Sequence, residues 1–463
     1  MLGDRAWQGK LLAELCALIV PVFAQARSRL VAFAYVAALL AVAGDRKSCW
    51  QLGEQAGHAT PRRMQALLAE YAWDWRAVLV RLQRFILAHL ADPEAILVLD
   101  ETAELKKGTM TVGVARQHAG ITGQIENCQT VVFLAYVTAR AHTLFDFRLY
   151  LPKQWCSDRE RREGAQVPEG TVFATKTEQG TEMVAEAVAA RVPFSWAAGD
   201  EVYGRSSKLR AACEDAGKGY VFAVPVSFKV TTAPGRRKTT VAALARLVPK
   251  AAWETRSCGR GCKGHRDYEW ALAATTSPRH WVLIRRKISG PAELAFFYCH
   301  APGLVSLSIL IKVAGKRWPV EECFQQGKGQ AGLDQHQLRL WRSFHRHTVL
   351  SMCALALLAV ATARPGTPAP WATAGRGTGA STCTTDQPEH WHDTGQLPVR
   401  PGEQPPQDMG LIRVTVPEAR RLLAPAAHRA TETFRCTWSI WRRRHQARAR
   451  WHHYQAQLRA AAA

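Results

Sequence analysis

The segment Ile96-Leu97-Val98-Leu99-Asp100 decides the fold class of this chain. Four consecutive apolar residues are typical of a strand that is buried on both faces of a sheet. Asp100 follows at the carboxyl end of this strand, which is the edge where α/β sheets place their ligand sites. The segment therefore predicts a central strand followed by a functional carboxylate. The alternative is a turn residue or a helix cap, the commoner role of an aspartate after a strand.

The pattern beyond this strand alternates between strands and helices. Residues 110–116 alternate less cleanly, whereas residues 144–151 alternate apolar and polar side chains and predict a more exposed strand. Further strands are expected at 130–138, 194–198 and 220–224, and helices at 181–191 and 206–216. This order predicts an α/β domain with a mixed sheet, which we assign to residues 93–225.

Residues 1–92, before the strand, have leucine and alanine at helical spacing and predict a helical domain. Within it a short helix over 50–56 ends at Gly57. Thr60 suits the N-cap of the next helix, 61–70, and Pro61 suits its first position. Arg62 and Arg63 then make a basic first turn, as in a helix-turn-helix that binds DNA. The alternative is an ordinary helical pair whose basic end faces solvent.

The second half of the chain divides by composition. Short strand candidates around Val230, Trp253, Trp270 and Trp281 predict a β-rich insertion over 226–305. Helices resume over 306–363. Residues 365–410 hold 8 Pro and 7 Gly, so we interpret 364–410 as a linker. Residues 411–463 are expected to be helical and basic, with 7 Arg and one acid over 431–463, which suits phosphate contacts or a solvated helix.

Overall charge indicates the class of partner. Lys plus Arg is 61 and Asp plus Glu is 38, so the net charge is 61 − 38 = +23. A field of that sign attracts polyanions, of which nucleic acid is the commonest. The 47% of hydrophobic residues excludes wholesale disorder. The 12 cysteines are scattered and no secretory signal is evident, which predicts a reducing cytoplasm.

Membrane insertion is not expected from the apolar stretches. The two longest run over 30–44 and 348–363. Both are shorter than the roughly 20 residues that span a bilayer, so we predict buried core helices.

Two further carboxylates stand where phosphoryl-transfer chemistry needs them. Asp200 follows a second apolar strand and a glycine. Glu321 lies on a helix, and Pro319 places the start of that helix near Arg317 or Trp318. At 100° per residue, positions 317, 321 and 328 share one helix face. Two-metal catalysis needs several carboxylates, and hard oxygen ligands suit magnesium. A solvent-facing charge pair on the helix is the alternative.

Seven segments of the chain resemble one family of enzymes. They are VLDET (98–102), LKKG (105–108), VGVARQHAG (112–120), IENCQ (125–129), FATK (173–176), GDEVYG (199–204) and RWPVEECFQQGKGQAGLDQHQLR (317–339). In order and spacing they are similar to DDE-type insertion-sequence transposases, and more narrowly to the insertion-sequence family numbered seven hundred and one. The resemblance covers about 51–346 and resumes weakly at 415–423 and 438–450.

The resemblance implies a ribonuclease-H-like catalytic core of the retroviral-integrase type, with a β-rich insertion and a helical N-terminal domain. Its three acids correspond to Asp100, Asp200 and Glu321, which are separated by 100 and 121 residues. The family's Tyr-Arg-Glu-Lys signature matches at Arg317, Glu321 and Lys328. The tyrosine position holds Ala314, which departs from the family pattern.

The resemblance also implies the reaction and its partners. The expected activity is magnesium-dependent cleavage at transposon ends followed by strand transfer into target DNA, with Mn²⁺ as a substitute metal. Asp100, Asp200 and Glu321 would hold the metal ions. The residues expected to contact DNA are Arg317, Lys328, Lys106, Lys107, Arg62 and Arg63. The protein is expected to act as a homo-oligomer on DNA, in the cytoplasm and associated with the nucleoid.

Two other functions remain open on the sequence alone. One is a DNA-binding protein descended from a transposase, and the other is a metal-dependent nuclease without strand transfer. The presence of all three carboxylates argues against a decayed site. The same metal site performs either cleavage alone or cleavage with joining.

Overall fold

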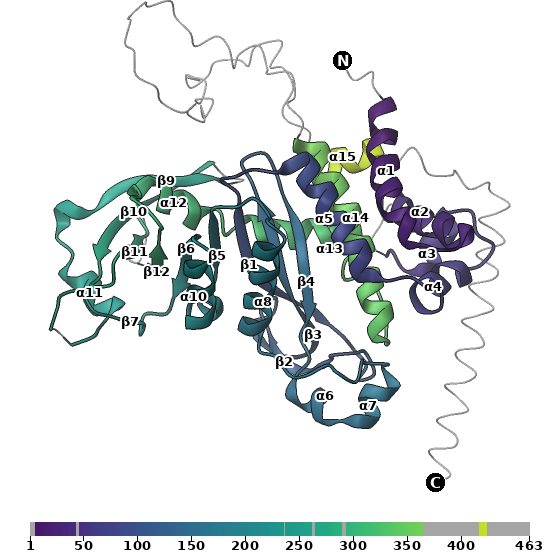
Figure 1. Ribbon diagram of the computed structural model, residues 1–463, viewed down its shortest axis with the longest axis horizontal. Helices are drawn as coiled ribbons and strands as arrows, with labels where there is room; N and C mark the ends of the chain where they lie inside the picture. Colours follow the sequence, from purple (N-terminus) through teal and green to yellow (C-terminus); the bar gives the residue numbers. More distant parts are fainter. Residues whose placement is uncertain are drawn as a thin grey trace, which may run out of the picture.

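The computed structural model describes residues 5–42, 46–235, 237–261, 264–288, 293–363 and 416–423. Figure 1 shows a central sheet with the N-terminal helices at one end of the molecule and a group of later strands at the other. The predicted linker 364–410 and most of the predicted basic region 411–463, including 431–463, lie outside the described residues.

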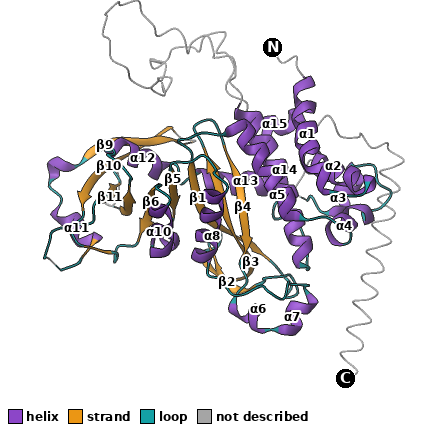
Figure 2. Cartoon of the chain, in the orientation of Figure 1, coloured by secondary structure: helices purple, strands orange, loops and turns teal. Residues whose placement is uncertain are grey.

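Strands from most of the chain join one mixed sheet (Figure 2). Its strands are β1 (Ile96–Leu105), β2 (Ala115–Ala119), β3 (Gln124–Val137), β4 (His142–Leu149), β5 (Trp196–Gly199), β6 (Gly219–Val224), β9 (Glu254–Gly261), β10 (Gly264–Ala274), β11 (His280–Arg286) and β12 (Leu294–His300). The order is β2-β3-β1-β5-β6-β12-β11-β10-β9, and β4 pairs with β3. Among the strand pairs of the described residues, β1-β5 and β5-β6 are parallel and the others are antiparallel. A short hairpin, β7 (Lys229–Val230) and β8 (Thr239–Thr240), forms a second sheet.

Helices cover both ends and faces of this sheet. In chain order they are α1 (Arg5–Ile19), α2 (Ala26–Ala41), α3 (Cys49–Gln55), α4 (Arg62–Ala69), α5 (Trp75–Leu90), α6 (Lys153–Ser157), α7 (Arg159–Gly164), α8 (Lys176–Ala189), α9 (Glu201–Gly204), α10 (Ser207–Asp215), α11 (Val241–Leu247), α12 (Leu307–Gly315), α13 (Pro319–Ala331), α14 (Trp341–Ala363) and α15 (Val416–Leu423), with 3-10 turns at Val20–Val22 and Lys250–Ala252. The prediction of helices over 1–92 and 306–363 is confirmed for the residues described.

Helix α14 is the core helix of the helical end. It packs against the helices α1, α2, α4, α5 and α13 and against strand β4. Among the described residues it is the one helix long and apolar enough to cross a membrane, and 89% of its most apolar window is buried inside the protein. The prediction of a buried core helix at 348–363 is therefore confirmed.

Helices α3 and α4 begin and end close to the residues predicted for them. Gly57, which follows α3, has a φ of +73°, a backbone conformation that favours glycine. The N-cap of α4 is Pro61 rather than Thr60. Thr60 still accepts a bond from the Arg62 amide at 3.4 Å through its hydroxyl oxygen, so the prediction was one residue out.

Three strand predictions need correction. First, β1 continues to Leu105, so Asp100 lies within the strand and not after it, because β3 pairs with β1 along its whole length. Second, residues 110–114 form a turn, and β2 begins only at Ala115. Third, β4 is buried rather than more exposed. Its polar Arg148 pairs with Asp146 at 2.8 Å and with Glu186 at 2.8 Å, which lets an alternating strand lie in the interior.

Residues 226–305, called the β-rich segment below, contain the predicted strands. Apart from the β7–β8 hairpin, these strands do not form a separate sheet, because β12 pairs antiparallel with β6 from Phe296↔Val224 to His300↔Tyr220. The segment therefore extends the central sheet beyond β6. The sequence pattern could not reveal this, since the pairing joins strands that lie more than 70 residues apart.

Candidate active site

Asp100 and Asp200 lie at the same edge of the sheet. Leu99 of β1 and Gly199 of β5 are partners in a parallel register, and each is followed directly in the chain by one of the two aspartates. The Asp200 carboxylate caps α9, since its Oδ1 accepts a bond from the Val202 amide at 2.9 Å. Two strands that run in the same direction thus place two carboxylates side by side. We call Asp100 and Asp200 the carboxylate pair.

Glu321 reaches this pair through Arg317. The Arg317 guanidinium lies 3.7 Å from Asp100 Oδ2 through Nη1 and 3.4 Å from Glu321 Oε1 through Nη2. As predicted, α13 begins near Trp318, at Pro319, and Glu321 lies in its first turn. Residues 100, 200 and 321, far apart in sequence, are therefore brought together around one arginine.

The turn that carries Arg317 is held by the β-rich segment. Arg266 of β10 donates a hydrogen bond from Nη2 to the Gly315 carbonyl at 3.2 Å, at the end of α12. A side chain at position 315 would overlap the Cys258 carbonyl oxygen of β9. The β9–β10 hairpin and the end of α12 consequently approach each other as closely as a glycine allows, which fixes the start of α13.

Glu322, the neighbour of Glu321, faces a different environment. Its Oε2 lies 3.3 Å from His142 Nε2, at the start of β4. Burial raises the pKa of the Glu322 carboxyl, against the attraction of Arg266 and Lys316. Two adjacent glutamates on one helix turn thus serve different partners, and only Glu321 shares Arg317 with the carboxylate pair.

The electrostatics of the carboxylate pair are unfavourable without further positive charge. Burial raises the pKa of Asp100 to about 7, and the negative charge of Asp200 acts in the same direction, while Arg317 opposes the shift. The pKa of Asp200 is also raised, first by burial and then by Glu101. Two neighbouring carboxylates that resist ionisation together are a suitable environment for a divalent cation.

The donor set fits a hard metal ion such as Mg²⁺ or Mn²⁺, which prefers carboxylate oxygens. Within the described ranges, however, no group of three or more Asp, Glu, His or Cys side chains is already arranged as a metal site. Arg317 lies between Asp100 and Glu321 and satisfies part of their charge. The residues thus fit a metal chemically, and the third acid is paired with an arginine in this structure.

A second charged group lies behind the pair, and the sequence analysis missed it. The Glu101 carboxylate accepts bonds from Lys176 Nζ at 2.8 Å and from the Tyr203 hydroxyl at 2.8 Å. These residues belong to the VLDET, FATK and GDEVYG segments, so three separate motifs meet here. The Tyr203 amide in turn lies 3.4 Å from Asp200 Oδ1. An acid directly beside Asp100 was the available signal. Tyr203 is fully buried, so its ring cannot stack on a DNA base. Trp318 is 49% exposed, so its ring is accessible to such a base.

The predicted DNA-contacting lysines have different environments. Lys106 Nζ pairs with Glu104 at 2.9 Å, with only 10% and 4% of the two side chains exposed. A phosphate contact by Lys106 would require this buried pair to open. Lys107 is exposed. Lys328 Nζ donates to the Ala103 carbonyl at 3.2 Å, so the structure places it beside β1.

The basic turn of α4 also has a local partner. Arg62 forms two hydrogen bonds with Glu70 at the other end of the helix, at 2.5 and 2.7 Å. Both side chains are more than half exposed, so this surface pair contributes little to stability and can exchange for a phosphate. Arg63 is exposed beside it. The assignment of this pair of helices to DNA binding stays a prediction.

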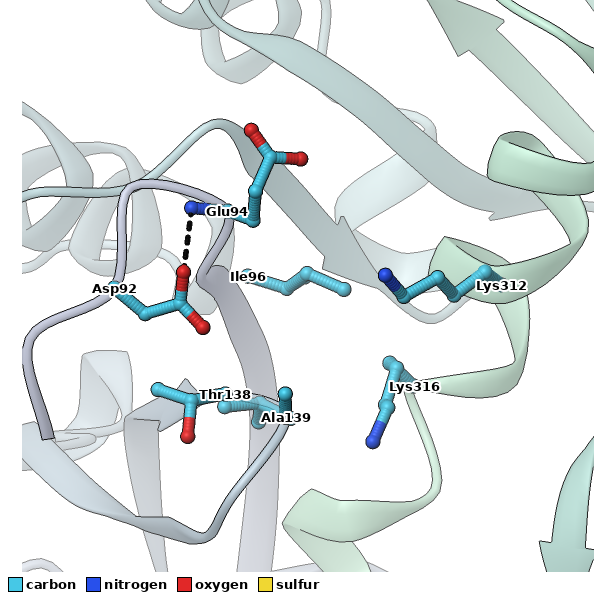
Figure 3. Close-up of a pocket in the computed structure, with 8 residues that line it drawn as sticks. Asp92, Glu94, Ile96, Thr138, Ala139, Lys312 and Lys316 are labelled. Carbon is cyan, nitrogen blue, oxygen red and sulfur yellow. Dashed lines mark hydrogen bonds between the residues drawn. The ribbon is translucent and has the colours of Figure 1, made fainter. Parts of the chain in front are cut away.

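A cavity at the opposite end of β1 lies away from the carboxylates. Figure 3 shows Asp92 and Glu94 on one side of it and Lys312 and Lys316 on the other, with Ile96 between them. Ile96 begins β1, four residues before Asp100. Its acids and lysines balance in number, so this cavity is not suited to a polyanion.

One prediction follows from the buried Asp100. Its pKa of about 7 in the folded protein exceeds its ordinary 3.8, so the stability associated with the protonated form is present below about pH 4 and is lost as the pH rises through 7. We expect Asp100→Asn to be more stable than the unsubstituted protein at about pH 8, by about 1–3 kcal/mol, and the difference to narrow towards about pH 5. Thermal unfolding in a metal-free buffer at both pH values measures it. A variant less stable at about pH 8 would contradict the raised pKa.

Comparison with known protein families identifies the superfamily of the chain. Residues 19–275 match the DDE superfamily endonuclease family, which is more than half of the chain. The chain therefore belongs to the DDE endonuclease superfamily. The match includes Asp100 and Asp200 and ends before Glu321. No curated protein matches the chain.

Membership defines the general function. The mixed sheet with helices around it fits a ribonuclease-H-like core, and the chain has a nuclease- or transposase-type activity on DNA. Enzymes of this superfamily generally use divalent metals.

Proposed function

We propose that the protein is a DNA transposase of the insertion-sequence type, related to the family numbered seven hundred and one. The observation that carries the proposal is the meeting of Asp100 and Asp200 at one sheet edge, with Arg317 joining them to Glu321. The further support is the seven-segment resemblance, which extends through Lys328, beyond the matched family range.

The three acids would hold two divalent metal ions, Mg²⁺ or Mn²⁺. Metal held there would activate a water molecule or a 3′-hydroxyl of DNA for attack on the phosphodiester and would stabilise the leaving oxygen. Asp200 is oriented for this role by its bonds to the start of α9. Asp100 is fixed in the middle of a paired strand. Rigid elements of this kind hold a reacting group in place better than loops do.

Arg317 would have two tasks in the proposed enzyme. Without DNA it neutralises Asp100 and Glu321, which stabilises an otherwise repulsive site. With DNA bound, its guanidinium is positioned to contact a phosphate beside the carboxylates, since arginine pairs with phosphate through two parallel bonds. Lys328 and Lys107 are proposed as further phosphate contacts, and Lys106 as one that requires release from Glu104.

The remaining parts of the chain are proposed to bind the ends of the element. We assign residues 1–92, with Arg62 and Arg63, to recognition of DNA, and 411–463 to non-specific phosphate contacts. Residues 93–225 and 306–363 form the proposed catalytic core around the segment 226–305, with 364–410 as a linker. The active form is proposed to be a homo-oligomer assembled on DNA in the cytoplasm.

The test uses the purified full chain and a labelled fragment containing the DNA that flanks its coding sequence. With Mg²⁺ we expect nicks at defined positions, followed by joined products when a supercoiled plasmid is added as target. Defined nicks without joined products would favour a nuclease over a transposase. Binding without any cleavage in Mg²⁺ or Mn²⁺ would favour the DNA-binding alternative and contradict the enzyme.

A further inference from the structure

A cleft opens beside Asp200 on the side of the β-rich segment. It has a volume of about 590 Å³ and lies between α9, β6, β11, β12 and the end of α12. Part of its lining consists of the short side chains of Ala223, Ala295 and Ala314. Phe297, the strand partner of Ala223, also lines the cleft. A cavity of this size holds one small ligand, in the range of about 300–1,000 Å³. It suits one nucleotide of a single strand better than both strands of a duplex.

The rim of the cleft carries a net positive charge, because its three arginines outnumber its two acids, Asp200 and Glu201. Arg205, Arg285 and Arg317 all line it, and we call it the arginine cleft. Within the part of the chain that the structure describes, Arg205 and Arg285 form no ion pair, whereas Arg317 is shared with Asp100 and Glu321. Arg285 lies 4.6 Å above the Tyr268 ring, which supports its side chain and leaves its charge uncompensated. Two guanidinium groups without carboxylate partners suit an anion.

The position of Ala314 explains why the cleft is open. In the signature of the resembling family this position holds tyrosine, and here it holds alanine. The structure places Ala314 in the lining of the cleft, three residues before Arg317 in the chain. A tyrosine side chain at 314 would occupy space that the alanine leaves empty. The departure from the family pattern thus enlarges the space beside the proposed scissile phosphate.

From these observations we propose that the arginine cleft binds the sugar–phosphate backbone of one DNA strand next to the scissile phosphate, with Arg205 and Arg285 as phosphate-binding residues. This inference rests on the proposed function, because Asp200 at one end of the cleft marks the reacting position. The strand would run from the carboxylate pair across β6 and β12 to Arg285 on β11. The β-rich segment would then be a DNA-binding extension of the catalytic sheet.

The test measures how affinity for DNA depends on salt. The probe is a labelled mixed-sequence duplex with a single-stranded extension, titrated by fluorescence anisotropy without divalent metal. Each phosphate contact on a single strand contributes about 0.7 to the slope of log K against log salt. We expect Arg205→Gln and Arg285→Gln each to lower the slope by about 0.7, and the double variant by about 1.4. Glutamine keeps most of the arginine stem and removes the charge.

Arg246→Gln is the matched control, because Arg246 lies exposed on α11 of the same segment and outside the cleft. It should leave the slope at the value of the unsubstituted protein. Ala314→Tyr should weaken binding of the extended probe by about tenfold while the plain duplex binds as before, since it fills space and removes no charge. An unchanged slope in the double variant, or an equal loss in the control, would overturn the inference.

The outcome is separable from that of the proposed function. If the unsubstituted protein nicks DNA and the double variant keeps its slope, the enzyme stands and the cleft assignment falls. If the slope falls as expected and no metal supports nicking, the cleft binds a strand and the transposase proposal fails.

Discussion

Glu321→Gln is expected to lower metal-dependent nicking of DNA by at least about three orders of magnitude while DNA binding persists. Glutamine keeps the volume and helix propensity of glutamate but removes the charge that would bind metal. Binding should be unchanged or slightly tighter, because one negative charge beside the phosphates is removed. Gel shift and nicking of labelled ends, measured on the same preparation, separate the two effects.

Glu322→Gln is the matched control for this experiment. It makes the same change on the same helix turn, so both variants lose a similar interaction with the helix dipole, about 0.3–1 kcal/mol. Glu322 faces His142 rather than Arg317, and its loss should leave nicking within a few-fold of the unsubstituted protein. If Glu322→Gln abolished nicking and Glu321→Gln did not, Glu322 rather than Glu321 would be the third acid.

Gly204→Ala is expected to destabilise the protein by about 3 kcal/mol or more. Gly204 ends the short helix α9, and a Cβ at this position would overlap the Ala223 carbonyl oxygen of β6. Backbone atoms of a paired strand cannot move aside as a flexible side chain can. Relief of the overlap must therefore displace α9, and with it Asp200, which caps that helix. The midpoint of urea unfolding and the nicking rate should both fall.

Gly329→Ala supplies the comparison, since no atom lies within 4 Å of its added Cβ and it lies within α13. Alanine in a helix interior is favoured over glycine by about 0.5–1 kcal/mol, so this variant should be slightly more stable. Equal stability of the two variants would mean that α9 and β6 are not packed as closely as the structure has them.

The elements of the site could be predicted from the sequence because each depends on local pattern. The apolar run before Asp100 indicates a buried strand wherever it lies in the sheet. Pro319 restricts the start of α13 to its own first turn, which sets Glu321 near the N-terminus of the helix. Such features require no knowledge of distant partners.

The features that sequence reasoning missed depend on contacts between distant segments. The burial of β4 requires Glu186 of α8 to help neutralise Arg148. The role of Glu101 requires Lys176 and Tyr203 to arrive from two other motifs. Lys106 appeared to be a surface cation because neighbouring positions are charged, yet it pairs with the buried Glu104. A single sequence contains no signal for pairings of this range.

The path of the chain also sets the order in which the protein is completed during synthesis. The strands that carry Asp100 and Asp200 leave the ribosome first, and the β-rich segment follows. Only then do α12 and α13 appear, with Arg317 and Glu321, followed by α14, against which α2, α4 and α5 pack. A growing chain therefore lacks the third acid until residue 321 is made, and its helical end lacks α14 until about residue 363. Any activity of this site begins only after these helices have emerged and docked, so a truncated nascent chain has no complete site with which to cut DNA.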